Sequence, residues 1–124
     1  MQSKNILITG SSGQFGTQFK LSENAPIDKF FYTPRSKLDI TNYEQLADFI
    51  ISNEIDIVIN CAAYTKVDEA EDFYVDAYNI NKEGCKNLAE ISSLYEVIII
   101  HISTDFVFDS PNKIFLDEKS PTNP

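Results

Sequence analysis

The chain has 124 residues, a hydrophobic fraction of 43% and a formal net charge of -9 at pH 7. Length and composition indicate one globular domain over residues 1–124 and exclude global disorder. The negative charge argues against nucleic acid or an anionic membrane surface as a partner. No stretch approaches the roughly 18 apolar residues of a membrane span. We therefore expect a cytoplasmic protein in which Cys61 and Cys85 are reduced.

Strand and helix patterns alternate along the chain. Short apolar, β-branched runs indicate buried strands, and apolar residues at helical spacing indicate helices. Expected strands are Asn5–Thr9, Lys29–Thr33, Asp56–Asn60 and Val97–Ser103, and expected helices are Gln14–Ser22, a helix capped by Thr41 with Glu44, and Asp72–Ser93. This alternation is typical of an α/β fold with a doubly wound parallel sheet covered on both faces.

Three of the four glycines fall in the stretch "ILITGSSGQFG", at Gly10, Gly13 and Gly16. They follow the first expected strand and open the first expected helix, as in dinucleotide-binding domains. There the glycines allow a tight turn, a close approach of the pyrophosphate and close helix packing, and the helix N-terminus favours phosphate. The alternative is a tight turn without a ligand. The absence of a Gly-Lys-Ser/Thr ending excludes a phosphate loop of the nucleotide-triphosphatase kind.

The second expected strand runs out into Thr33–Lys37, where NAD-binding domains commonly place an acidic side chain on the adenosine ribose. This chain has Arg35 and Lys37 there instead. Two positive charges favour the 2′-phosphate of NADP(H), or tolerance of both NADP(H) and NAD(H). The alternative is a solvated turn.

Further blocks make the chain resemble the dTDP-4-dehydrorhamnose reductase family, within the extended short-chain dehydrogenase/reductase superfamily. They are "LDITN", "NCAAYTKVDEAE", "AYNINKEGCKNLAE", "HISTDFVFD" and "PTNP". The resemblance implies a Rossmann-like fold and NAD(P)H-dependent reduction of the 4-keto group of dTDP-4-dehydrorhamnose. In that family the catalytic Tyr and Lys follow the point that corresponds to residue 124. We therefore expect the amino-terminal, cofactor-binding part of a longer enzyme, inactive alone.

The resemblance also implies roles for individual residues. The expected cofactor-binding residues are Gly10, Gly13, Gln14, Phe15, Gly16, Arg35, Asp39, Ile40, Cys61, Ala62, Ala63, Tyr64 and Thr65. Asp39 would accept a bond from the adenine amino group, and Ile40 would cover the ring. Val67 would flank the nicotinamide side, where the dTDP-sugar substrate binds. No metal ligand set is expected.

Thr104 is the expected catalytic hydroxyl, bonding the substrate carbonyl, with Ser103 and Asp105 as weaker substrate-binding candidates. Asn81 lies on the apolar stripe of the third expected helix. We therefore expect its amide to face the sheet and to support the active site through hydrogen bonds. For Thr104 the alternative is a turn-capping hydroxyl, and for Asn81 a satisfied core amide. His101 lies inside a strand, where a packed structural role is expected.

Two other functions stay open at this point. One is another sugar-nucleotide epimerase or reductase of the extended family, and the other is a non-catalytic NADP-binding regulatory subunit. The apolar run Val97–Ser103 contains no proline or lysine. If this strand is the edge of the sheet, it will recruit a second copy or be covered by the segment from about Asp109, so a homodimer is one expectation.

Overall fold

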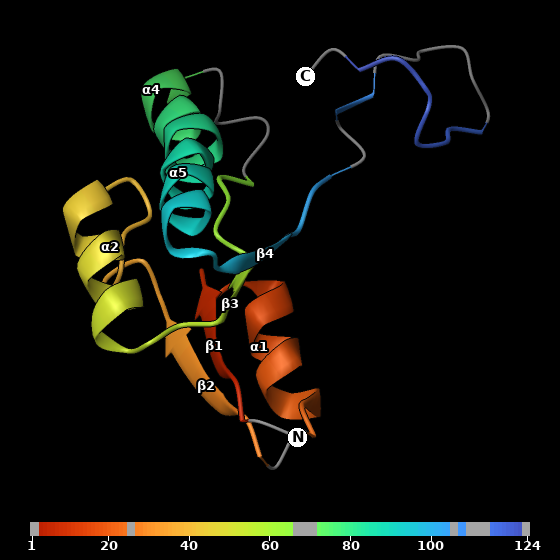
Figure 1. The fold of residues 1–124 in the computed structure, drawn as a ribbon. Coiled ribbons are helices and arrows are strands. Elements are labelled where there is room, and N and C mark those ends of the chain that lie inside the picture. The colour runs from red at the N-terminus through yellow and green to blue at the C-terminus, as the bar shows by residue number, and fades with distance from the viewer. Residues whose placement is uncertain (1–2, 25–26, 66–71, 105–106, 109–114, 123–124) are drawn as a thin grey trace.

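A computed structural model describes residues 3–24, 27–65, 72–104, 107–108 and 115–122 of the chain (Figure 1). Val67 and Asp105, two of the expected site residues, lie outside these ranges. The strands are β1 (Asn5–Thr9), β2 (Lys29–Thr33), β3 (Ile57–Asn60) and β4 (Ile98–His101). The helical segments are α1 (Gln14–Ser22), α2 (Tyr43–Ser52), α4 (Tyr74–Tyr78), the π-helical η1 (Asn79–Gly84) and α5 (Cys85–Tyr95).

The four strands form one parallel sheet in the order β2-β1-β3-β4. Helix α1 covers one face, and α2 and α5 cover the other (Figure 1). Alternate residues of β1 serve the two layers: Leu7 packs in the cluster under α2 and α5, while Ile6 and Ile8 pack in the cluster under α1. The expected α/β, Rossmann-like architecture is confirmed.

The expected start of α2 is wrong by one residue. Asn42 is the N-cap, and its side-chain oxygen accepts from the Gln45 N–H at 3.0 Å. The Thr41 hydroxyl instead donates to Asp39 at 2.8 Å. Asparagine and threonine both cap helices well, and the competing bond to Asp39 leaves the cap to Asn42.

The expected long helix is present from Tyr74 to Tyr95, but its middle turn, Asn79–Gly84, is π-helical. A Cβ on Gly84 would lie 2.6 Å from the Ile40 side chain, so η1 packs closely against the loop before α2. A π turn shifts the side chains that follow it around the helix axis. Strict 3.6-residue periodicity therefore does not place every side chain of this helix.

Strand β4 lies at the edge of the sheet, and Ile98 and Ile100 are 61% and 48% exposed. The described residues beyond Thr104 extend away from the sheet in Figure 1. They do not cover β4, so the expectation that a segment from about Asp109 folds back over this edge is not supported for residues 115–122.

Candidate functional site

The described site residues gather where the strands end. In a parallel sheet all carboxyl ends meet at one edge, and ligands of such sheets bind there. The segments that leave this edge are residues 10–13 after β1, 34–42 after β2, 61–65 after β3 and 102–104 after β4. Every expected site residue within the described ranges lies in or directly after one of these segments, except Asn81 on η1.

Gly10 has φ +60°, in the left-handed region that favours glycine. A Cβ there would lie 2.6 Å from the backbone N and Cα of Ala62, so any side chain would collide with the segment after β3. The Gly13 N–H closes the turn by donating to the Gly10 carbonyl at 3.0 Å. The first two glycines thus build a tight turn pressed against Cys61 and Ala62.

Helix α1 begins directly after this turn. Gly13 is its N-cap, no side chain caps the end, and no acidic residue stands in its first turn. The first N–H groups of a helix lack intrahelical partners and carry the positive end of its dipole. Gly16 is buried, and a Cβ on it would lie 2.6 Å from Ser11 Cα, so it packs the helix onto its own turn. The arrangement is suited to an anionic group.

Phe15 leaves the first turn of α1 and is 45% exposed. Its ring stacks on that of Phe19, with centroids 6.1 Å apart. Phe19 in turn packs edge-on against Phe30 of β2. Phe15 therefore has a supported position with one side open to solvent.

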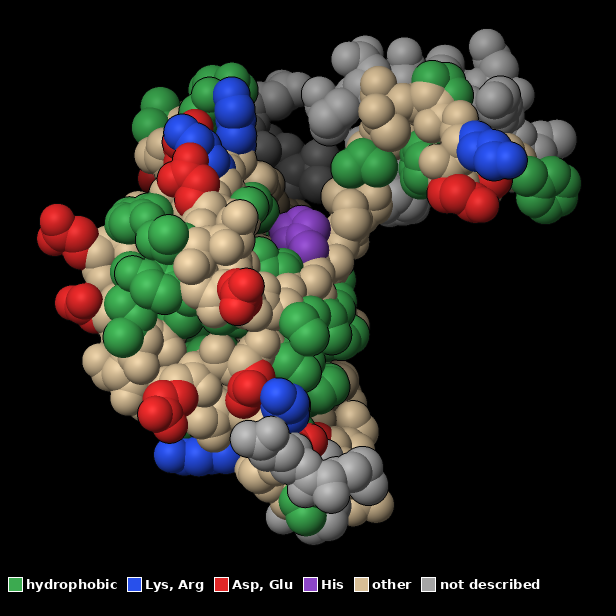
Figure 2. Space-filling model, in the orientation of Figure 1, with side chains coloured by type: hydrophobic (Ala, Val, Ile, Leu, Met, Phe, Trp, Pro, Cys, Tyr) green, Lys and Arg blue, Asp and Glu red, His purple; other side chains and the backbone are tan. Residues whose placement is uncertain are grey.

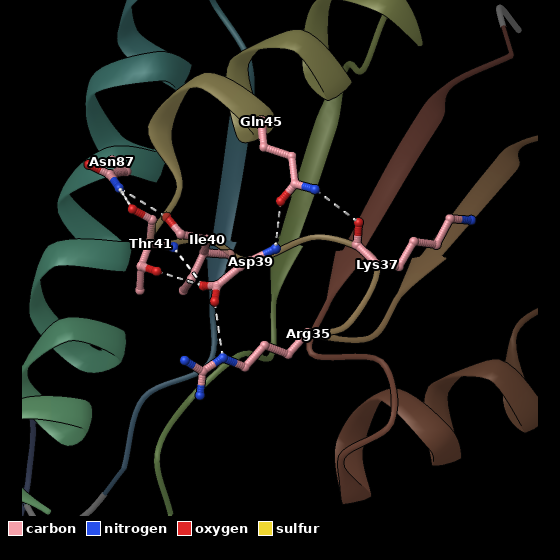
Figure 3. Close-up of polar contacts among 7 residues, drawn as sticks. All are labelled: Arg35, Lys37, Asp39, Ile40, Thr41, Gln45 and Asn87. Carbon is pink, nitrogen blue, oxygen red and sulfur yellow. Dashed lines mark hydrogen bonds and ion pairs between the residues drawn. The ribbon is translucent and has the colours of Figure 1, made fainter.

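Arg35 and Asp39 form an ion pair in the segment after β2 (Figure 3). Arg35 Nε donates to Asp39 Oδ2 at 3.1 Å, and Asp39 Oδ1 accepts from the N–H and hydroxyl of Thr41 at 3.0 and 2.8 Å. Partial burial alone would raise the pKa of Asp39, but these hydrogen bonds outweigh it and hold the pKa below its usual value. The Lys37 side chain points away from this pair (Figure 3).

Two amides fix the rest of this segment. Gln45 Oε1 accepts from the Asp39 N–H at 3.2 Å, and Asn87 Nδ2 donates to the carbonyls of Ile40 and Thr41 (Figure 3). Ile40 itself is 3% exposed and packs against Gly84 in the core. The expectation that its side chain covers an adenine ring is therefore wrong: this side chain anchors the loop instead.

Asn81 reaches the segment after β3 rather than the sheet. Its Oδ1 accepts from the Tyr64 N–H at 2.8 Å and its Nδ2 donates to the Tyr64 carbonyl at 3.2 Å. The residue is exposed, so the expected orientation toward the sheet is wrong, while the expected hydrogen bonding to backbone is confirmed. The buried residues of η1 are Ile80 and Gly84, and Asn81 lies beside this stripe rather than on it.

The remaining residues of that segment are small or polar. Cys61 and Ala62 are half-buried, Ala63 and Thr65 are exposed, and burial raises the pKa of the Cys61 thiol. Both cysteines are free thiols. A protonated thiol at this place acts as a small apolar side chain, not as a nucleophile.

Ser103 and Thr104 are exposed just beyond β4. His101, the single histidine, lies at the surface where the C-terminal segment leaves the body of the molecule (Figure 2). It is hydrogen-bonded to Asn60 at 2.9 Å, as a structural role predicts, but it is exposed because β4 is an edge strand.

One pair near Asn81 was not singled out from the sequence. Tyr78 and Lys82 stand one turn apart, and the Lys82 ammonium lies 2.5 Å from the Tyr78 hydroxyl and 4.4 Å from its ring centroid. The hydrogen bond to Tyr78 raises the pKa of Lys82, so the lysine stays charged. The i,i+4 spacing of a tyrosine and a lysine on a helix is the signal that could have found this pair.

Two other kinds of site are absent from the described ranges. There, no three His, Cys, Asp or Glu side chains are grouped so as to hold a metal ion. Nor does this part of the chain contain a helix of the length and apolarity that crossing a membrane requires.

Comparison with known proteins gives consistent results. The family described as "RmlD substrate binding domain" matches residues 4–124. The dTDP-4-dehydrorhamnose reductase of Aggregatibacter actinomycetemcomitans is 40% identical over 84% of this chain and 36% of its own length. That of Mycolicibacterium smegmatis is 36% identical over 99% of this chain and 38% of its own length.

Solved structures agree. The dTDP-4-dehydrorhamnose reductase of Clostridium acetobutylicum superposes with a TM-score of 0.90 at 39% identity, over 97% of this chain and 43% of that one. The Bacillus anthracis reductase, crystallised in complex with NADP, gives 0.86 at 36% identity, over 92% and 40%. The chain thus spans less than half the length of these relatives. It belongs to the RmlD family, whose members compared above are dTDP-4-dehydrorhamnose reductases.

Proposed function

We propose that the carboxyl edge of the sheet binds NADP(H), and that the whole protein reduces the 4-keto group of dTDP-4-dehydrorhamnose to the alcohol of dTDP-rhamnose. The observation that carries the proposal is the Gly10–Gly13 turn, which leads into the uncapped N-terminus of α1. The NADP complex of the Bacillus anthracis relative supports the choice of cofactor. A cytoplasmic location is part of the proposal.

The turn and helix fit a pyrophosphate. Gly10 leaves no room for a side chain above Ala62, and the free N–H groups at the start of α1 would donate to phosphate oxygens. Gly13, Gln14, Phe15 and Gly16 would line this part, while Cys61, Ala62 and Ala63 would pass beneath the adjoining ribose. Small side chains there let the backbone approach a ligand closely.

The pair Arg35–Asp39 fits the adenosine end. Arg35 uses only Nε for Asp39 in the described contacts, so its terminal nitrogens remain donors for a 2′-phosphate. Asp39 Oδ1 is occupied by two bonds from Thr41, but Oδ2 accepts one and has a second lone pair for the adenine amino group. One ion pair would thus offer a cation to the 2′-phosphate and a hydrogen-bond acceptor to the adenine amino group.

Reaction groups would come from the segments after β3 and β4. Reduced nicotinamide supplies the hydride that reduction of a carbonyl requires. Thr104 would donate a hydrogen bond to the substrate carbonyl oxygen, with Ser103 and Asp105 beside it, and so orient and polarise the carbonyl. Asn81 would act as a positioning residue, because it holds the Tyr64 backbone. Tyr64 and Thr65 would flank the nicotinamide side, and Val67, to which the same role is given, lies outside the described residues.

Calorimetric titration of NADPH and NADH into the 124-residue chain tests the cofactor assignment. Arg35→Ala should weaken NADPH binding by roughly 1 to 3 kcal/mol and leave NADH binding nearly unchanged, since only NADPH carries the 2′-phosphate. Lys37→Ala is the matched control, because it removes a neighbouring charge that points away from Asp39. Equal losses for both cofactors, or equal effects of both variants, would remove the assignment.

The partner that this geometry supports is a second copy of the chain, bound through β4. Ile98, Ile100 and Ile102 are 61%, 48% and 37% exposed, and within the described ranges β4 pairs with β3 alone. Unprotected strand edges pair with other chains, so a homodimer of the 124-residue chain is proposed at this edge.

A further inference from the structure

Asn60, the last residue of β3, joins the ends of three strands. It is 1% exposed. Its Oδ1 accepts from the Thr9 hydroxyl at 2.6 Å and from the Ala62 N–H at 3.2 Å. Its Nδ2 lies 2.9 Å from His101 Nδ1 and 3.8 Å from the Cys85 sulfur. One buried amide thus links β1, β3, β4 and α5.

The orientation of the Asn60 amide follows from its neighbours. The backbone N–H of Ala62 can only donate, so the atom that faces it must be the amide oxygen. Nδ2 then faces His101, and an amide NH₂ group can only donate. His101 Nδ1 must therefore present a lone pair, which places the ring proton on Nε2 and leaves the ring neutral.

We infer that Asn60 positions the Cys61–Thr65 loop while it holds His101 as the neutral Nε2–H tautomer, and that a proton on His101 releases this loop. A proton on Nδ1 would put an N–H donor against the Asn60 NH₂ donor at hydrogen-bond distance. The contact would turn from attractive to repulsive. Because Oδ1 and Nδ2 belong to one amide, a turn of Asn60 away from the ring would cost the Ala62 N–H its acceptor.

The described neighbours of the Asn60–His101 contact come from β1, from the segment after β3 and from α5. The groups around the Asn60–His101 contact are the Thr9 hydroxyl from β1, the Ala62 N–H and the Cys85 thiol from α5. Burial raises the pKa of Cys85, so this thiol stays neutral. No lysine, arginine or carboxylate among the described residues forms a hydrogen bond or ion pair with His101 in the contacts above. Histidine side chains commonly change charge between about pH 5 and 8.

This contact bears on the candidate site because Ala62 is the residue that Gly10 abuts, at 2.6 Å from the position of a Gly10 Cβ. A shift of Ala62 would move the surface on which the glycine turn rests. If the proposed function holds, acid should therefore weaken NADPH binding through His101. That consequence rests on the proposed function, whereas the state of the ring does not.

The first experiment is nitrogen NMR of the cofactor-free chain, in which a single histidine gives one pair of ring signals. At about pH 7.5 we expect the proton on Nε2, and on acidification we expect the Ala62 amide signal to shift together with the ring. A ring proton on Nδ1 at neutral pH, or an Ala62 signal indifferent to ring protonation, overturns the inference. Asn60→Asp should move a proton onto Nδ1, because a carboxylate oxygen only accepts. If that variant does not fold, the wild-type spectra still decide.

The second experiment compares NADPH affinity at about pH 7.5 and about pH 5.5. The wild-type chain should bind NADPH about three- to tenfold more weakly at the lower pH. This factor corresponds to the loss of one hydrogen bond, the bond from the Ala62 N–H to Asn60. His101→Asn places an amide oxygen near the position of Nδ1 and cannot gain a proton, so its affinity should change less. His101→Gln reaches the position of Nε2 instead and should be weakened at both pH values.

Equal drops in the wild type and His101→Asn would overturn the link to binding, because they would arise from the phosphates of the ligand or from other groups. If NADPH binds at neither pH, the proposed function fails. The nitrogen NMR of His101 and Ala62 then still decides the inference about Asn60 by itself.

Discussion

Alanine substitutions at Gly10 and Gly13 distinguish the role of the glycine turn in stability from its proposed role in binding the cofactor pyrophosphate. At Gly10 a Cβ would lie 2.6 Å from Ala62 N and Cα and 2.8 Å from the Cys61 carbonyl carbon, and φ is +60°. These neighbours are backbone atoms, so relief requires movement of the chain. Overpacking costs about 1 to 3 kcal/mol, and a left-handed alanine adds about 1 to 2 kcal/mol. Gly10→Ala should destabilise the fold by roughly 2 to 5 kcal/mol.

Gly13 gives the opposite expectation. A Cβ there would meet only the Gly10 carbonyl oxygen at 3.2 Å, and φ is -72°. Loss of a favourable glycine N-cap should cost about 0.5 to 1 kcal/mol of stability. A methyl group at the start of α1 would, however, stand where the pyrophosphate is proposed to lie, so NADPH affinity should fall at least tenfold.

The assay is urea unfolding of both variants, followed by calorimetric titration with NADPH at a temperature where each is folded. We expect Gly10→Ala to lose more stability than Gly13→Ala, and Gly13→Ala to lose NADPH affinity out of proportion to its loss of stability. A Gly10→Ala variant as stable as the wild type would refute the geometric reasoning at Gly10. A Gly13→Ala variant with full affinity would refute the place given to the pyrophosphate.

Three further predictions concern the acid range, the sheet edge and turnover. Because the folded-state pKa of Asp39 is lowered, its contribution to stability is complete above the unfolded value of about 3.9 and is lost as pH falls through the folded value. The stability difference between wild type and Asp39→Asn should therefore shrink below about pH 4 in urea unfolding, and a difference constant with pH would contradict this. Ile100→Lys should abolish self-association in light scattering, whereas Ile51→Lys on α2 should not. The two isoleucines are similarly exposed, at 48% and 49%, so equal behaviour of the two variants would argue against self-association through the β4 edge. Residues 1–124 should bind NADPH without oxidising it in the presence of dTDP-4-dehydrorhamnose, and turnover would contradict the expected inactivity of this part. If turnover were seen and the Tyr78→Phe variant lacked it, the activity would be assigned to the Tyr78–Lys82 pair.

Sequence reasoning succeeded where local chemistry decides the structure. The strands Asn5–Thr9 and Lys29–Thr33 and the helix Gln14–Ser22 have the expected bounds. The two strands end directly before Gly10 and Pro34, and the helix begins directly after Gly13. The tight turn expected at Gly10 is also confirmed, and its left-handed φ is seen in the structure. These features need no knowledge of what lies across the sheet.

The errors arise where a distant residue decides the outcome. Ile40 is buried because Gly84, far along the chain, leaves space for it. Asn81 faces Tyr64 because the backbone of the segment after β3 supplies its hydrogen-bond partners, which lie 17 residues away in the sequence. From the sequence, Asn60 is only the end of a strand, because its partners come from β1, β4 and α5. Only the assembled sheet brings those partners together.

The most direct test of the central claim is a map of amide NMR shifts as NADPH is added to the chain. We predict that the shifts concentrate in the segments that leave the carboxyl edge of the sheet, which are Gly10–Gly16, Arg35–Ile40 and Cys61–Thr65. Residues at the opposite edge, such as Asn5 and Asp56, should be unaffected. Shifts that concentrate at that opposite edge or on the outer face of α5, with the glycine turn unmoved, would contradict the claim.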